Sequence, residues 1–139
     1  MGMVYADIEL TNAFDLMKAE AGELPEGDIR RMTVRMLVDS GCGTLAINNN
    51  IREQLGLRTR EERAMQMADE SVVTLDVVGP VELRFENRRS ILEAVVLPGN
   101  AEPLLGAIPM QDMDVLVDPH RHRLIVNPDH PILAGGLLK

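Results

Sequence analysis

Leu37-Val38-Asp39-Ser40-Gly41 is the most informative stretch of this sequence. It ends the run 31–38, which alternates between polar and apolar residues and then becomes fully apolar, as a strand that enters a core does. The pattern therefore predicts a carboxylate, Asp39, held at the end of a buried strand, in a turn where Gly41 lets a ligand approach the backbone. Taken alone, Asp-Ser-Gly is equally consistent with an aspartate that only caps a turn.

Short apolar or alternating segments lie on both sides of this turn. They predict strands over 4–10, 31–38, 45–47, 65–68, 72–78, 81–85, 91–97, 103–106, 115–119 and 123–128. Asn48 is a predicted cap for a helix that starts near Asn49 and ends at Gly56, and residues 109–113 predict one or two further helical turns. Many short strands separated by turn residues predict an all-β barrel or sandwich with one or two short helices.

Turn and loop signals divide these segments. Glycine and proline predict a loop or hairpin turn over 19–28 and the end of a strand at Gly79-Pro80. Residues 86–89 predict the turn of a hairpin between 81–85 and 91–97. Residues 58–63, in which arginine and glutamate are interleaved, predict a solvated face.

Length and charge exclude several classes of protein. The chain has 139 residues, which predicts a single domain, and 22 acidic against 14 basic side chains give a net charge of −8. A non-specific nucleic-acid binder meets phosphates with lysine and arginine, and it stacks bases on aromatic side chains. Because this chain is acidic and has only three aromatic residues, we expect no nucleic-acid partner.

Cysteine usage and hydropathy indicate the compartment. Cys42 is the only cysteine, so an intrachain disulfide is excluded. The N-terminal stretch contains Asp7 and Glu9, where a signal peptide would keep an apolar run, and no segment reaches the roughly 20 apolar residues of a membrane span. We therefore expect a cytoplasmic protein without a membrane partner.

A second motif gives the first one a context. Val38-Asp39-Ser40-Gly41 is followed, after strand-rich sequence, by Leu104-Leu105-Gly106. This pair of motifs resembles the retropepsin-like (clan AA) aspartic proteases, especially their bacterial single-domain branch. Further matches lie at 51–57, 101–109, 112–119 and 124–128, and the resemblance covers roughly residues 3–131. It implies an all-β, closed barrel of the acid-protease fold with one lobe per chain, a protease domain over 1–128 and a C-terminal tail, 129–139, that we expect to be mobile.

The resemblance also implies an activity. Members of the family hydrolyse peptide bonds with a water molecule held between two aspartates, without metal or cofactor. Asp39 is in the only Asp-Ser/Thr-Gly motif of this chain, so the second carboxylate must come from a second copy, and a homodimer is expected. The family places Ser40 across the two-fold axis on the partner's backbone and Gly41 along the main chain of a peptide or protein substrate. Leu104, Leu105 and Gly106 would support the turn from below.

A hairpin that closes over the substrate is a further feature of the family. Here the candidate is 65–75, with Ala68, Asp69, Glu70 and Ser71 at its tip. Retroviral flaps are rich in glycine, and this tip has none. Cys42 stands where the family usually has alanine, and Gly43 stands where retroviral enzymes commonly have aspartate. The glycine-free tip and Cys42 favour an alternative on the same fold, a non-catalytic dimerisation or peptide-binding module. A processing enzyme with one partner as its substrate is a third possibility.

Other chemistry-bearing residues predict no metal site. His120 and His122 would share a face on a strand, but in a turn they are expected to be solvent-exposed polar residues. Asp112, Asp114 and Asp118 lack the glycine-centred spacing of a calcium loop and are expected to cap a helix and turns.

Overall fold

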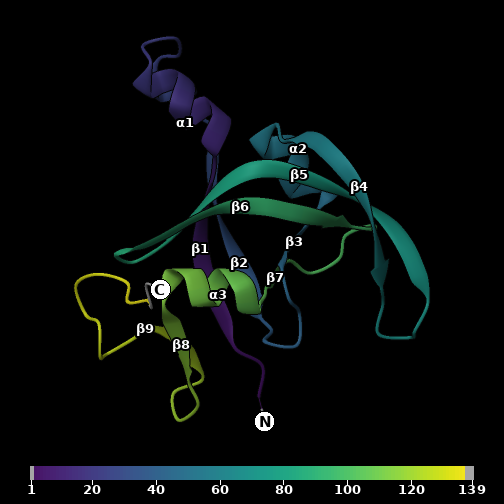
Figure 1. Cartoon of the computed structure of the whole chain (residues 1–139), viewed down its shortest axis with the longest axis vertical. Coiled ribbons are helices and arrows are strands. Elements are labelled where there is room, and N and C mark those ends of the chain that lie inside the picture. Colours follow the sequence, from purple (N-terminus) through teal and green to yellow (C-terminus); the bar gives the residue numbers. More distant parts are fainter. Residues whose placement is uncertain (1, 137–139) are drawn as a thin grey trace.

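The computed structural model describes residues 2–136, which form nine strands, three α-helices and one short 3₁₀ helix (Figure 1). The strands are β1 (Tyr5–Asn12), β2 (Arg31–Val38), β3 (Leu45–Asn48), β4 (Arg58–Gln66), β5 (Val72–Phe85), β6 (Arg88–Leu97), β7 (Leu104–Leu105), β8 (Val115–Asp118) and β9 (Arg123–Val126). The helices are α1 (Ala13–Glu20), α2 (Asn49–Leu55) and α3 (Ala107–Met113), and the 3₁₀ helix is Glu26–Asp28.

Six strands close into a ring, which confirms the predicted barrel. The order is β1-β2-β7-β3-β6-β5, and β5 pairs back onto β1. Most neighbours are antiparallel, but β2 runs parallel to β7 and β3 runs parallel to β6. β4 pairs only with β5 and extends the sheet beyond the ring, while β8 and β9 form a separate hairpin. The ring leaves β4 as the exposed edge of the main sheet.

Aliphatic side chains fill the barrel, as the scarcity of aromatic residues predicts. In β1, alternate residues Ala6, Ile8 and Leu10 are buried, and Val34 and Met36 face them from β2. Full burial of each such side chain contributes about 1.5–3 kcal/mol. The period of two along these strands therefore fixes which face of each strand lies inside.

A smaller apolar cluster lies outside the barrel interior. It consists of Ala46, Leu75, Val77 and Val95, with Met65, Val73, Leu97 and Leu104 packed against it. These residues come from β3, β4, β5, β6 and β7, so the cluster connects the β4–β5 hairpin to the ring. The hairpin is thereby held against the side of the barrel at which β2 ends.

The predicted segments around the central turn are confirmed. β2 has the predicted bounds, and β8 and β9 form the predicted last hairpin. In α2, the side chain of Asn48 accepts a hydrogen bond from the Ile51 amide (3.0 Å), and Gly56 ends the helix in the left-handed conformation (φ +62°). These signals are local, which is why sequence alone places this helix.

The prediction of a loop over 19–28 is wrong at its start, because α1 occupies Ala13–Glu20. Asn12 caps this helix by accepting a hydrogen bond from the Asp15 amide (3.1 Å). Only Ala13 and Asp15 are buried in it, so the helix has no apolar stripe that a periodicity search could detect. Figure 1 shows it standing at the end of the molecule away from the chain termini.

Three strand boundaries are also corrected. β4 begins at Arg58 rather than Met65. The prediction missed residues 58–64 because they are exposed on both faces and show no alternation of apolar with polar side chains. β5 continues through Gly79-Pro80. A β-bulge interrupts the pairing with β6 at this point, so proline, which has no N–H group, need not donate a hydrogen bond to the neighbouring strand. The following hairpin turn is only Glu86-Asn87, since β6 starts at the buried Arg88.

The segment after β9 makes several polar contacts with the barrel. The Asp114 carboxylate accepts a hydrogen bond from the Gly135 amide (2.8 Å) and lies 2.7 Å from His130 Nδ1. The buried guanidinium of Arg88 donates to the backbone carbonyl of His130, and Asn87 donates to the carbonyl of Pro131 (2.9 Å). The mobility of 129–139 stays a prediction, and residues 137–139 lie outside the described part of the chain.

No helix of residues 2–136 is both long enough and apolar enough to cross a bilayer.

Candidate active site

Asp39 lies where β2 leaves the barrel, and β7 holds it there. Its backbone amide donates to the carbonyl of Leu105 (3.0 Å), and the Leu37 amide donates to the carbonyl of Pro103 (3.0 Å). These bonds continue the parallel register that pairs Leu37 with Leu104 and Val38 with Leu105. The two motifs singled out in the sequence therefore lie side by side, on the paired strands β2 and β7.

The turn after Asp39 is closed by its own backbone. The Cys42 amide donates to the Asp39 carbonyl (3.1 Å), and the Gly41 amide donates to Asp39 Oδ1 (2.9 Å). The second carboxylate oxygen, Oδ2, has no hydrogen-bond partner among residues 2–136. Asp39 is half-buried and Ser40 is exposed, so one oxygen is fixed by the turn and the other is free to meet water.

Gly106 lies directly beneath this turn. A Cβ atom at this position would stand 2.1 Å from the Thr44 carbonyl oxygen and 2.6 Å from that of Cys42, so only glycine fits. The next two amides extend the contact, since Ala107 donates to the Cys42 carbonyl (2.7 Å) and Ile108 to the Gly43 carbonyl (3.2 Å). Hydrogen bonds from the start of α3 therefore hold the backbone of the turn in place.

A cavity of about 490 Å³ opens beside Asp39. One wall is the turn, with Gly41, Cys42 and Thr44, and the opposite wall is the β4–β5 hairpin, with residues 65–68. Its floor is formed by apolar side chains of the ring and the hairpin, namely Ala46, Leu75, Val95, Leu97 and Leu104. The cavity could hold an extended segment of polypeptide between the carboxylate and the hairpin.

The tip of the β4–β5 hairpin is an ordered turn. The Met67 amide donates to the Ser71 carbonyl (2.8 Å), and Asp69 Oδ1 accepts from the amide (3.0 Å) and the hydroxyl (2.5 Å) of Ser71. The hydrogen bonds from Ser71 hold the pKa of Asp69 below its usual value, because they stabilise the ionised carboxylate. Glu70 has a positive φ of 70°, in a position that glycine often occupies.

A second cavity, of about 520 Å³, adjoins the other side of Asp39. It is bounded by the strand end 37–40, the N-terminal segment 2–4, and Val117, Pro119 and His122 of the β8–β9 hairpin. Several apolar side chains on this side face solvent, including Met3 (70% exposed) and Val117 (39% exposed). Asp39 therefore lies between two hollows rather than at the bottom of one.

The remaining polar candidates do not assemble into a metal site. Within residues 2–136, no three histidine, cysteine, aspartate or glutamate side chains come together to hold an ion. Asp118 accepts from the His120 amide (3.0 Å), as expected of a turn cap, and Asp112 accepts from the Ser90 hydroxyl (2.5 Å). Cys42 Sγ lies 3.4 Å from the Thr44 carbonyl, at the edge of the cavity beside Asp39.

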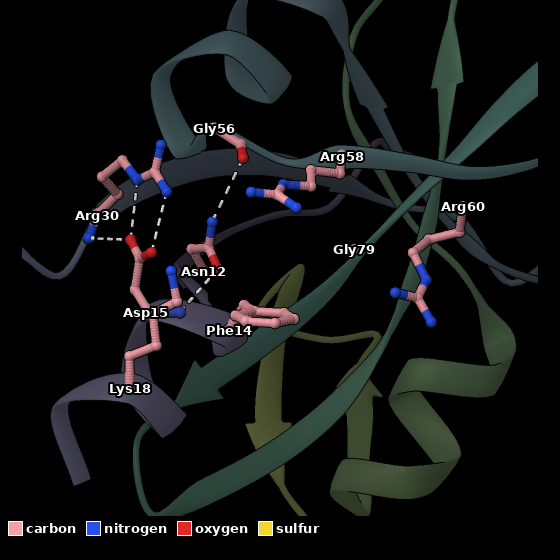
Figure 2. A pocket seen from close by; sticks show the side chains of 9 residues that line it. All are labelled: Asn12, Phe14, Asp15, Lys18, Arg30, Gly56, Arg58, Arg60 and Gly79. Carbon is pink, nitrogen blue, oxygen red and sulfur yellow. Dashed lines mark hydrogen bonds and ion pairs between the residues drawn. The ribbon is translucent and has the colours of Figure 1, made fainter. Parts of the chain in front are cut away.

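A smaller pocket lies near α1 and shares no lining residue with the cavities at Asp39 (Figure 2). In it, Asp15 accepts from the side chain of Arg30 through both carboxylate oxygens (2.8 and 2.9 Å) and from the Arg30 amide (3.0 Å). These bonds hold the pKa of Asp15 below its usual value. The pair ties α1 to the start of β2, which is a structural rather than a chemical role.

Sequence reasoning placed Asp39 beside Leu104–Gly106 and near the hairpin 65–75, but it missed the part of the cavity that residues 44–46 and β6 line. Thr44, Val95 and Leu97 were not singled out, because each is an ordinary strand or loop residue in its local context. The apolar run in the second half of β6 predicts a buried strand without saying what its faces enclose.

Comparisons with known proteins agree with this geometry. A sequence model of the family described as aspartyl protease matches residues 26–117. The fold is similar to the retroviral protease-like domain of Ddi1 from Leishmania major, with a TM-score of 0.54, 13% identity, and coverage of 92% of this chain and 90% of that chain. A retropepsin-like aspartic protease from Rickettsia conorii has a TM-score of 0.49, 13% identity, and coverage of 84% and 77%. No curated protein matches the chain significantly. At this identity the Leishmania structure bears on the fold alone, and with the six-strand ring it confirms the predicted retropepsin-like barrel.

Proposed function

Because the chain belongs to the aspartyl protease family, we propose that it is an aspartic endopeptidase whose active form is a homodimer. One observation carries the proposal. The Asp39 carboxylate is fixed through one oxygen by the Gly41 amide (2.9 Å), while it lines a cavity large enough for a peptide. A half-buried carboxylate in a rigid turn beside a cleft is suited to acid–base work on a bound substrate.

The number of carboxylates requires two copies. Water attack on an amide needs one group that accepts a proton and one that donates a proton, and among residues 2–136 Asp39 is the only charged residue that lines this cavity. A second Asp39 from a symmetry-related copy would supply the missing group. Two unit charges about 4 Å apart at an effective dielectric near 20 repel by about 4 kcal/mol, or roughly three pKa units, so the pair would share one proton over a wide pH range.

The reaction follows from that shared proton. The ionised aspartate accepts a proton from a water molecule, and the oxygen of that water forms a bond to the scissile carbonyl carbon. The protonated aspartate donates its proton to the carbonyl oxygen, which gives a neutral tetrahedral intermediate. Transfer of a proton to the amide nitrogen then lets the carbon–nitrogen bond break and releases an acid and an amine. The chain needs no metal or cofactor for these steps.

The neighbouring residues have supporting roles in this proposal. Leu104, Leu105 and Gly106 position the turn through β7 and the start of α3, and Gly41 leaves room for the main chain of the substrate. Ser40, which is exposed, contacts the backbone of the partner subunit. The β4–β5 hairpin serves as the flap, with its tip at Ala68, Asp69, Glu70 and Ser71, since residues 65–68 line the same cavity as Asp39.

The second subunit docks, in this proposal, on the Ser40 side of the turn. The hollow there is bordered by the N-terminal segment and the β8–β9 hairpin, and Met3 and Val117 expose apolar surface beside it. Burial of that surface against a second copy would favour association. It would also bring two Asp39 turns face to face across the two-fold axis.

Asp39→Asn tests the proposal. Wild type is expected to cleave peptides of a mixed-sequence library between acidic and neutral pH, and Asp39→Asn is expected to lose cleavage completely, because an amide can neither accept nor donate the required proton. Asp7→Asn, which removes an exposed carboxylate from β1, is the matched control and should cleave like wild type. Far-UV circular dichroism and sedimentation velocity establish that both variants keep the fold and the dimer. Cleavage by Asp39→Asn would contradict the assignment.

The glycine-free tip of the hairpin favours one other function, a peptide-binding module without catalysis. Such a module would bind library peptides with equal affinity in wild type and Asp39→Asn, and it would leave them intact. Mass spectrometry of the bound peptides after long incubation distinguishes the two functions.

A further inference from the structure

We propose that the pocket beside α1 binds the phosphate group of a small molecule (Figure 2). Four basic side chains line this pocket, against a single carboxylate, that of Asp15; the four are Lys18, Arg30, Arg58 and Arg60. The pocket shares no lining residue with the two cavities of the candidate active site, so this inference does not depend on the proposed peptidase function.

Such a concentration of positive charge is unexpected in this chain. The protein has 22 acidic and only 14 basic side chains, and its net charge is −8. Four of those basic side chains nevertheless meet at one hollow, two from β4 and the others from α1 and the start of β2. A hollow lined by one sign of charge raises the local concentration of ions of the opposite sign. The pocket is therefore suited to an anion, although the molecule as a whole repels anions.

Pairing within the protein neutralises only part of this charge. Asp15 binds Arg30 through both carboxylate oxygens (2.8 and 2.9 Å), and Arg60 Nε lies 3.5 Å from Glu93 Oε2. Lys18 and Arg58, in contrast, form no ion pair within residues 2–136. The pocket therefore holds two positive charges that the described part of the chain leaves without a partner.

The two unpaired cations approach the pocket from different elements. The Lys18 ammonium lies 5.4 Å from the centre of the Phe14 ring, which is itself part of the pocket wall. Arg58 extends from β4 toward Asn12, the residue that caps α1 (Figure 2). α1 is held on this side of the molecule by the bonds between Asp15 and Arg30, so the two walls of the pocket are already in place before a ligand binds.

Size and charge together favour a phosphate group. The pocket has a volume of about 80 Å³, and one water molecule needs roughly 10–15 Å³ of such space, so it can hold a small polyatomic anion but not a peptide. A phosphate ester carries a charge of about −1.5 to −2 near pH 7, which matches two unpaired cations better than the single charge of a carboxylate does. The planar guanidinium of Arg58 can donate two hydrogen bonds to phosphate oxygens.

Nuclear magnetic resonance titrations test the inference. Inorganic phosphate and phenyl phosphate are the probes, and acetate at the same ionic strength is the control anion. Both phosphates are expected to shift the backbone amide signals of Phe14, Gly56 and Gly79 in a saturable way, and to bind about threefold to tenfold more tightly than acetate. Phe14 is 46% exposed, so tighter binding of phenyl phosphate that is lost in Phe14→Leu identifies an ester, whereas equal affinities identify the free ion as sufficient.

Two variants assign the binding to the unpaired cations. Arg58→Gln and Lys18→Gln each remove one positive charge, and each is expected to weaken phosphate binding about threefold to tenfold. The matched control is Arg35→Gln, which removes an exposed arginine of β2 that lies outside the pocket and forms no ion pair within residues 2–136. It should bind phosphate like wild type. Arg58→Lys keeps the charge and should retain part of the affinity.

The outcomes are distinct from those of the peptidase experiments, because none of them requires cleavage of a peptide. Saturable binding at this pocket that weakens in Arg58→Gln but not in Arg35→Gln supports the inference. The inference is overturned if neither phosphate gives saturable shifts, if the shifts centre on residues outside the pocket, or if acetate binds equally well. An equal loss of affinity in Arg35→Gln would indicate a general effect of net charge and would overturn it as well.

Discussion

Gly106 is required by distance rather than by backbone conformation. Its φ is −88°, which any residue can adopt, but a side chain would meet the carbonyl oxygens of Thr44 and Cys42 at 2.1 and 2.6 Å. Both contacts are with backbone atoms, which cannot rotate away as the end of a flexible side chain can. The two carbonyls belong to the Asp39 turn, so the absence of a methyl group at this position allows β7 and α3 to approach the Asp39 carboxylate.

Gly106→Ala is therefore expected to lower the free energy of unfolding by about 1–3 kcal/mol, the usual cost of overpacking, and to reduce cleavage by displacing the turn. Urea denaturation and peptide hydrolysis measure the two effects. Gly27→Ala is the matched control, since a Cβ at Gly27 meets nothing within 4 Å and its φ is not positive. Equal stability of Gly106→Ala and wild type would contradict the close approach.

The contact between α1 and β2 is an electrostatic one. α1 buries little apolar surface, and its position depends on Asp15, which accepts three hydrogen bonds from Arg30 at the entrance to β2 (Figure 2). Arg30 lowers the pKa of Asp15, so the folded state binds the Asp15 proton less readily than the unfolded chain does. The stabilisation is therefore present above the unfolded pKa of 3.8 and is lost as the pH falls through the lower folded value.

Asp15→Asn should lower the free energy of unfolding near pH 7 by about 1–3 kcal/mol, the usual contribution of hydrogen bonds to a charged group. The difference from wild type should shrink as the pH falls below 3.8, because Asp15 of wild type then also becomes neutral. Urea denaturation at several pH values measures it. Asp28→Asn, which removes an exposed carboxylate at the end of the 3₁₀ helix, should show no such pH-dependent difference. A difference for Asp15→Asn that grows with acidity would contradict the predicted sign.

At the scale of the whole molecule, the proposed activity belongs to a pair of chains. In the proposed dimer, each subunit supplies one carboxylate and half of the cleft, so the fraction of active enzyme depends on association between subunits. Mixing active and inactive subunits tests this dependence directly.

Wild type mixed with excess Asp39→Asn is expected to lose most of its activity, because mixed dimers hold only one aspartate. Peptide hydrolysis at constant wild-type concentration measures the loss, after time for subunit exchange. Excess Asp7→Asn should not inhibit, since its mixed dimers keep both catalytic aspartates. Activity that stays constant in excess Asp39→Asn would indicate that one chain is sufficient.

Local signals explain what could be predicted about individual elements. The bounds of β2, the two caps of α2 and the turn after Asp39 follow from residues a few positions apart, so they are legible in the sequence. α1 and the first half of β4 were missed for the opposite reason. The side chains in the first half of β4 are exposed, and α1 buries only Ala13 and Asp15, so no apolar period marks either segment. The local cap at Asn12 was the one sequence signal for α1 that went unused.

The sequence by itself determined the all-β class, the turn that presents Asp39 and the motif that supports it, because these depend on short-range patterns of apolar, glycine and capping residues. Only the tertiary structure decided that β1 closes onto β5, that the Leu105 carbonyl receives the Asp39 amide, and that residues of separate strands line one cavity beside the carboxylate. Those contacts join positions far apart in the chain, and pairing between distant strands depends on how the whole barrel packs rather than on any local preference.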